Sequence, residues 1–199
     1  MKNLISLSAV LLGAAIALPS NATLISGNTI AAPGSVVDDA AEGGAENTMI
    51  QGFNERQNVT LLDAITVDGA TIAAGTIVSS HMLFLNTRGR SLVEREGLFD
   101  FDGIILGVMS DSLGLLEAAT NDLLGALGTF YPGNFSARGL EGGFDGYTVT
   151  GNSINVQMRV TEPGDWIRVV TAANVPEPAT LALLGLGLVG IGTSRKTSK

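Results

Sequence analysis

Apolar residues gather in two runs near the ends of the chain, and between them they occur only in short stretches. The first run covers residues 4–18 and the second residues 179–192, and neither contains a charged side chain. The roughly 150 residues between the two runs have the length of one ordinary domain. The pattern predicts one central domain flanked by two hydrophobic segments.

From Met49 onward, short apolar runs alternate with turn residues. Runs of this length, separated by pairs such as Asp68-Gly69 and Pro163-Gly164, are typical of β-strands. The expected strands cover residues 59–67, 71–78, 81–86, 98–109, 147–160 and 166–171. The part 103–109 has no polar alternation, which favours a central strand covered on both faces.

The clearest local pattern is a β-hairpin around Gly151-Asn152. Apolar and polar residues alternate on both sides of this pair, from Tyr147 to Val160. Because successive side chains of a strand point to opposite faces, one set from the second arm faces the core. That set is Ile154, Val156, Met158 and Val160.

One stretch departs from the strand pattern. Residues 112–127 place Leu116, Ala119, Leu123 and Leu127 at three- and four-residue steps, with Asp111 and Ser112 as candidate caps. This spacing predicts a helix. The fold class is therefore expected to be mainly β, a two-sheet β-sandwich with one short helix, extending over residues 49–174. Residues 23–48, rich in small and polar residues, are interpreted as a poorly ordered entry segment.

The N-terminal run has the organisation of a secretory signal peptide. Lys2 precedes the apolar helix, Pro19 ends it, and small residues stand at Ser20 and Ala22. We therefore expect signal peptidase to remove residues 1–22 by cleavage between Ala22 and Thr23, with cleavage after Ala17 as the alternative.

The C-terminal segment, residues 175–199, combines a rigid motif, a short apolar run and a basic tail. Pro176, Glu177 and Pro178 form an extended segment, because each proline fixes φ and removes a backbone donor. The run that follows would cover about 21 Å as a helix, short of the ~30 Å hydrocarbon core. Its leucines are Leu181, Leu183, Leu184, Leu186 and Leu188, and the basic cluster begins with Arg195 and Lys196. The positive-inside rule then places the central domain outside the membrane.

This combination resembles the PEP-CTERM sorting signal of Gram-negative bacteria, a segment also catalogued as the C-terminal domain of an ice-binding protein. The resemblance implies that an exosortase-like membrane protease recognises Pro176-Glu177-Pro178. It further implies export across the inner membrane, transient insertion through the short helix, and release to the cell surface or an exopolysaccharide matrix. A permanent membrane anchor preceded by a rigid spacer is the alternative.

Composition narrows the chemistry of the central domain. The chain has no cysteine and a single histidine, His81, which excludes disulfides, thiolate metal sites and a cysteine nucleophile. Residues 23–174 hold 18 carboxylates against seven arginines and no lysine. This acidity argues against nucleic acid as a partner.

Candidate site residues remain few, and no cofactor is expected. Asp100, Asp102 and Asp111 border an apolar strand and are weak candidates for calcium ligands. Ser79 or Ser80 beside His81 would suit a hydrolase, but neither serine lies in a Gly-x-Ser-x-Gly motif.

Three functions stay open. The chain is expected to be a secreted, non-catalytic surface or extracellular-matrix protein. A carbohydrate-binding module, assisted by calcium, is the first alternative and a secreted hydrolase the second. The aromatic residues that could stack on sugars are Phe130, Tyr131, Phe135, Phe144, Tyr147 and Trp166, although a core position is the more ordinary role for them.

Overall fold

The computed structural model describes residues 22–37, 47–87, 91–162 and 164–173. Eleven strands and one helix are present in this part of the chain, so the expectation of a mainly β fold is confirmed. In chain order the elements are β1 (Leu24–Ser26), β2 (Gln51–Asn54), β3 (Val59–Thr60), β4 (Ile65–Val67), β5 (Ala70–Ile72), β6 (Ile77–Leu85), β7 (Val93–Phe101), β8 (Ile105–Met109), α1 (Leu115–Leu124), β9 (Gly146–Thr150), β10 (Ser153–Val160) and β11 (Asp165–Ala172).

The first sheet has the order β1-β7-β10-β9 and is antiparallel throughout. Its β9–β10 hairpin turns at Gly151, whose φ of 65° lies in the left-handed region that glycine adopts without strain. The four inward residues predicted for the second arm, from Ile154 to Val160, are each at most 1% exposed. The hairpin and its facing are confirmed.

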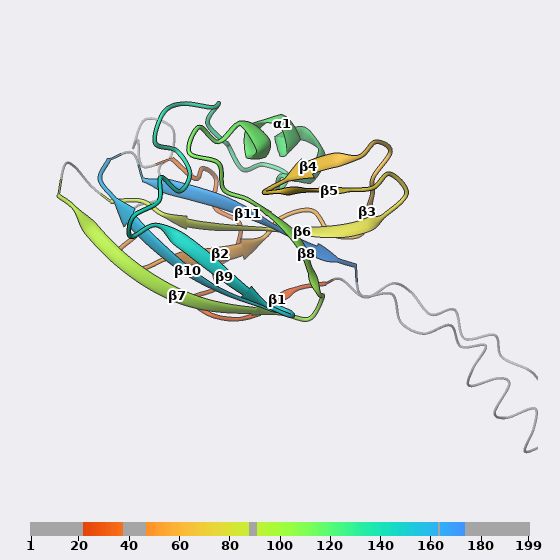
Figure 1. Ribbon diagram of the computed structural model, residues 1–199, viewed down its shortest axis with the longest axis horizontal. Helices are drawn as coiled ribbons and strands as arrows, with labels where there is room; N and C mark the ends of the chain where they lie inside the picture. The colour runs from red at the N-terminus through yellow and green to blue at the C-terminus, as the bar shows by residue number, and fades with distance from the viewer. Residues whose placement is uncertain (1–21, 38–46, 88–90, 163, 174–199) are drawn as a thin grey trace, which may run out of the picture. The chain divides into compact units, whose positions relative to one another are not determined.

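The second sheet has the order β2-β6-β11-β8 and faces the first (Figure 1). The main hydrophobic core lies between them, because its buried side chains come from both sheets. The first sheet supplies Leu24, Phe99, Phe101, Ile154, Val156, Met158 and Val160, and the second supplies Leu83, Leu85, Val108, Ile167 and Val169. This two-sheet packing is the expected sandwich.

A third layer covers the far face of the second sheet. It consists of α1 and the β4–β5 hairpin, which Figure 1 shows on the side away from β7, β9 and β10. Leu124 of α1 packs there with Val78 of β6 and Val170 of β11. As a result β6 and β11 are buried on both faces.

The expected doubly covered strand was assigned to the wrong residues. Residues 105–109 form β8 at the edge of the second sheet, and Ile104 is 65% exposed. The central strands are β6 and β11, whose sequences contain buried polar residues, among them His81 and Arg168. A run of apolar residues was therefore a poor guide, since polar side chains with partners can also line a covered face.

The helix is shorter than predicted, and a different face of it is buried. It covers Leu115–Leu124 instead of 112–127, and its fully buried residues are Glu117, Thr120 and Leu124. Leu127, expected in the core, is 82% exposed. The Glu117 carboxylate pairs with Arg138 of the connection after α1, and the Thr120 hydroxyl accepts from Arg168 of the sheet below. Asp111 does cap the helix, because its carboxylate accepts hydrogen bonds from the backbone N–H groups of Leu115 and Leu116.

Part of the entry segment 23–48 belongs to the folded domain. Strand β1 pairs with β7, and Val36 is fully buried beside Trp166. The part of the expected signal peptide before Ala22 and the C-terminal segment 175–199 lie outside the described residues. Among the helices that are described, none is long and apolar enough to cross a membrane.

Candidate functional site

A buried ion pair joins the second sheet to the segment that follows β2. Arg168 of β11 donates from Nε to Glu55 Oε2 at 2.7 Å and from Nη2 to Glu55 Oε1 at 2.8 Å. Both side chains are fully buried. The Ser80 hydroxyl of neighbouring β6 also donates to Glu55 Oε2. Burial alone would lower the pKa of Arg168, but the carboxylate of Glu55 outweighs it and raises that pKa.

The same guanidinium fastens α1 to the sheet. Arg168 donates to the Glu117 carbonyl and to Thr120 Oγ1, and a third bond reaches Asn121 Oδ1 at 2.9 Å. The Glu117 carboxylate forms a second buried ion pair with Arg138. Burial raises the pKa of Glu117, while the charge of Arg138 opposes this shift. This network of buried opposite charges holds the third layer in place.

The serines and histidine considered for a hydrolase are engaged elsewhere. His81 is fully buried, with Nδ1 2.8 Å from Asn54 Oδ1 and Nε2 3.0 Å from Thr171 Oγ1. Burial lowers its pKa to about 3, so the ring is neutral at physiological pH. Ser80 lies on the opposite face of β6 and donates to Glu55, and Ser79 accepts from the backbone N–H of Asn58. Among the described contacts, His81 makes no hydrogen bond to either serine side chain.

The three weak calcium candidates do not meet. Asp100 accepts hydrogen bonds from the hydroxyls of Ser153 and Ser26, which lower its pKa and tie β1 and β10 to β7. Asp102 accepts from the backbone N–H and the hydroxyl of Thr23. Asp111 is the helix cap. Each of these carboxylates therefore serves a local structural contact.

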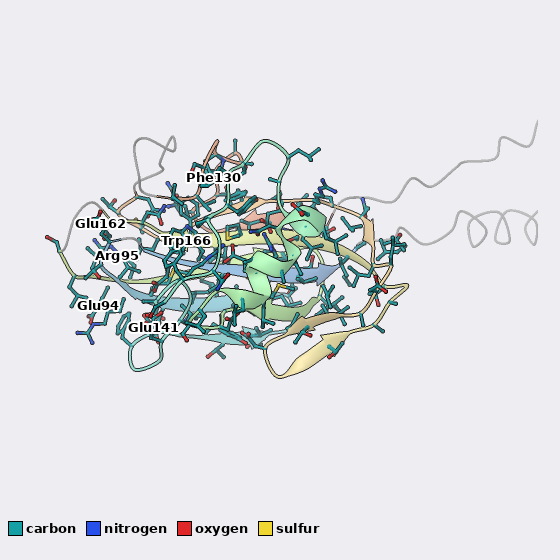
Figure 2. All side chains as sticks on the ribbon, turned by 90° about the horizontal axis from the view of Figure 1, so that it is seen from above. Glu94, Arg95, Phe130, Glu141, Glu162 and Trp166 are labelled. Atoms are coloured by element: carbon teal, nitrogen blue, oxygen red, sulfur yellow. The ribbon has the colours of Figure 1, made fainter. Side chains whose placement is uncertain are left out.

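A different group of carboxylates is brought together at one end of the sandwich. One carboxylate oxygen from each of Glu141, Asp145 and Asp165 lies within 4.8 Å of the other two. We call this group the acidic cluster. Asp165 is the first residue of β11 in the second sheet, and Asp145 directly precedes β9 in the first sheet. Figure 2 shows Glu141 at the same end of the sheets as Glu94 and Glu162.

The backbone fixes two members of the acidic cluster. Asp145 Oδ1 accepts a hydrogen bond from the backbone N–H of Arg159 on β10. Asp165 follows Gly164, which has a φ of 94° and where a Cβ would lie 2.4 Å from the carbonyl oxygen of Leu85. Only glycine fits at this position, so the start of β11 is held against β6.

The carboxyl groups of the acidic cluster resist full ionisation, because burial and neighbouring carboxylates disfavour the charged forms of Asp165 and Glu141. Asp165 is only 3% exposed, and its Oδ2 is buried without a hydrogen-bond partner. Burial, and then the charges of Glu141 and Asp145, raise the pKa of Asp165 to about 9. Burial and Asp145 raise the pKa of Glu141 to about 7. A divalent cation bound by these oxygens would favour their ionised forms.

The acidic cluster was not predicted from the sequence. Its local signal is the stretch from Glu141 to Gly146, where two carboxylates flank Gly142 and Gly143, both with φ in the left-handed region. The third member, Asp165, is distant in sequence and reaches the cluster because β11 and β9 begin at the same side of the sandwich.

The aromatic residues do not form one exposed platform. Trp166 is 1% exposed and contacts Phe135 edge-to-face, at 5.7 Å between ring centroids. Tyr131 packs under Arg168, and Tyr147 packs against the main core. Phe130, labelled in Figure 2, is 46% exposed and lines a surface hollow of about 440 Å³ beside the end of α1. The core position predicted for most of these rings therefore holds for Trp166, Phe135, Tyr131 and Tyr147, whereas Phe130 is exposed.

These features define a mainly β domain of sandwich type with a fully buried polar network and the acidic cluster. Comparison with protein families adds the C-terminal segment: the PEP-CTERM protein-sorting motif matches residues 174–196. The resemblance seen at Pro176-Glu177-Pro178 is thereby confirmed. No curated protein and no solved structure matches the chain. The motif indicates export and exosortase-dependent sorting to the cell surface.

Proposed function

We propose that the chain is a non-catalytic surface or extracellular-matrix protein, whose folded domain is delivered into an exopolysaccharide layer by its sorting segment. The observation that carries this proposal is the PEP-CTERM motif at residues 174–196. In this proposal signal peptidase removes residues 1–22, and an exosortase-like protease processes the chain near Glu177.

The geometry of the domain supports a role without catalysis. A general base must accept a proton near neutral pH, and burial holds the pKa of His81 near 3. The serines beside it serve Glu55 and the backbone. The side chains most suited to acyl-transfer chemistry are therefore used to stabilise the sandwich.

The exposed face of the first sheet supports a solvated, surface-located protein. Apart from Leu98, which is 59% exposed, its outward residues on β7 and β10 are polar. Asn155 donates to Glu96 at 2.6 Å, and Arg159 lies 3.4 Å from Glu94. These pairs cross between neighbouring strands. A polar face of this kind can contact hydrated polysaccharide without exposing a large apolar patch.

The decisive experiment compares the native host with a strain that lacks its exosortase. Intact mass and cell fractionation are measured for the wild type, for Glu177→Ala, and for Glu162→Ala as a control glutamate inside the domain. We expect the wild type and Glu162→Ala to appear outside the cell with the tail removed. Glu177→Ala, and every form in the strain without exosortase, should retain the tail in the membrane fraction.

Two results would overturn the proposal. Removal of the tail in the absence of exosortase would separate this chain from that sorting route. Hydrolysis of a polysaccharide or ester by the purified protein, abolished by replacement of a domain residue, would show that it is an enzyme.

A further inference from the structure

We propose that the acidic cluster is a calcium site that clamps the two sheets of the sandwich together. Glu141, Asp145 and Asp165 would supply carboxylate oxygens, which are the ligands that Ca²⁺ prefers. The inference concerns the fold of the domain and does not depend on how the chain is sorted.

The first argument is the orphaned oxygen of Asp165. A carboxylate that is 97% removed from solvent normally has a partner for each oxygen, yet Oδ2 has none among the described residues. Its nearest charged neighbours in the acidic cluster are two further carboxylates, Glu141 and Asp145. A divalent cation placed among the three oxygens would provide the missing partner.

The second argument is the topology of the site. Asp165 begins β11 of the second sheet, and Asp145 precedes β9 of the first, while its Oδ1 is anchored to β10 through Arg159 N–H. Glu141 belongs to the connection that runs from the third layer to β9. One ion bound here would therefore link β11 of the second sheet to the connection 141–145 and, through Asp145, to β10 of the first sheet.

The third argument distinguishes calcium from other cations. The cluster contains oxygen donors only, and the chain has no cysteine and a single histidine buried elsewhere, which disfavours Zn²⁺. Mg²⁺ requires a compact octahedral shell, whereas Ca²⁺ accepts six to eight oxygens in flexible geometry. Two carboxylates from the connection before β9 and a third from β11, with Glu141 exposed for added water ligands, fit Ca²⁺ better.

The test uses the purified full chain in mild detergent, freed of metal with chelator, and titrated with CaCl₂ or MgCl₂. Binding is measured by isothermal titration calorimetry and stability by thermal unfolding. We expect one Ca²⁺ per chain and a rise in Tm of about 5–10 °C at a free Ca²⁺ concentration 100 times the Kd. Mg²⁺ should produce less than half of that shift.

The key variant is Asp165→Asn, which keeps the shape of the side chain and removes its charge. We expect it to bind Ca²⁺ at least 10-fold more weakly and to lose the Ca²⁺-dependent rise in Tm. Without metal, the variant should melt at or above the wild-type temperature, because asparagine avoids the cost of protonating Asp165 in the folded chain, or of holding its charge beside Glu141 and Asp145. This combination separates loss of a ligand from failure to fold.

Asp100→Asn provides the matched control, since Asp100 is an aspartate whose oxygens are already held by Ser26 and Ser153. Its Ca²⁺ titration should match the wild type. The proposal is overturned if Ca²⁺ does not bind the wild type, or if Asp165→Asn shows the same Ca²⁺ stoichiometry and Tm shift as the wild type.

Discussion

The buried pair between Glu55 and Arg168 offers a quantitative test of what holds the third layer to the sheet. Replacing Glu55 by glutamine keeps the size of the side chain and one acceptor oxygen, but removes the charge opposite Arg168. In the wild type two charge-assisted hydrogen bonds of 2.7 and 2.8 Å join these fully buried groups. The variant leaves a guanidinium with only neutral acceptors and the more distant carboxylate of Glu117.

The expected cost follows from the loss of one partner of a buried ion pair, which is about 3–5 kcal/mol. Coulomb attraction of unit charges about 4 Å apart at an effective dielectric constant of about 20 gives a similar figure, about 4 kcal/mol. Because glutamine retains one acceptor and Glu117 remains nearby, we place Glu55→Gln at the lower end, about 3 kcal/mol. With a urea m-value of about 2 kcal/mol/M, the midpoint should fall by about 1.5 M.

Urea unfolding can be followed by the fluorescence of Trp166, the single tryptophan, which is 1% exposed in the folded domain. The control is Glu94→Gln, which breaks the exposed pair with Arg159, whose side chains are 50% and 47% exposed. That variant should lose less than about 1 kcal/mol. Equal losses of unfolding free energy for Glu55→Gln and Glu94→Gln would refute the argument. Glu55→Gln should also cost less in a chain that already carries Arg168→Met, and the same cost in both chains would refute it as well.

Two further predictions test the sandwich itself. Val156→Asp places an unpaired carboxylate in the main core, where Val156 is fully buried. It should cost several kcal/mol of a total free energy of unfolding of about 10 kcal/mol. Far-UV circular dichroism should show an unfolded chain, whereas the control Thr148→Asp, on the exposed face of β9, should fold. His81→Gln tests the buried imidazole: its folded pKa, about 3, lies below the unfolded value of 6.5, so the unfolded state binds the proton first as pH falls. Between pH 7 and pH 5 the wild type should lose about 2 kcal/mol more stability than His81→Gln in urea titrations, and parallel pH profiles for the two proteins would contradict the neutral, buried histidine.

Local sequence patterns predicted the parts of the fold that depend on alternation within one strand. The β9–β10 hairpin is the clearest case, because the solvent on one face and the core on the other impose a period of two on residues 154–160. The sorting segment was likewise recognisable, because its signal is contained in a few consecutive residues from Pro176 onward.

The pattern failed where polar side chains are buried with partners from distant segments. Arg168 and Glu55 are 113 residues apart, and each alone predicts an exposed position. Because such pairs allow charged side chains to be buried, the strands covered on both faces are β6 and β11, and Glu117 of α1 faces inward. A single sequence contains no local signal for such a pair, since the desolvation of each charge is offset only after the chain has folded.

Glu55 and Asp165, two of the buried carboxylates of this domain, differ in a way that bears on the calcium proposal. Glu55 is opposed by a guanidinium and receives a hydroxyl hydrogen bond from Ser80, so its burial is balanced by contacts within the chain. Asp165 is buried to a similar degree, but its neighbours are carboxylates and one of its oxygens is unpaired. For folding alone, an asparagine at position 165 would fill the same space without this repulsion. The calcium proposal accounts for this unfavourable position of Asp165. It requires that the wild type bind calcium and that Asp165→Asn bind it at least 10-fold more weakly.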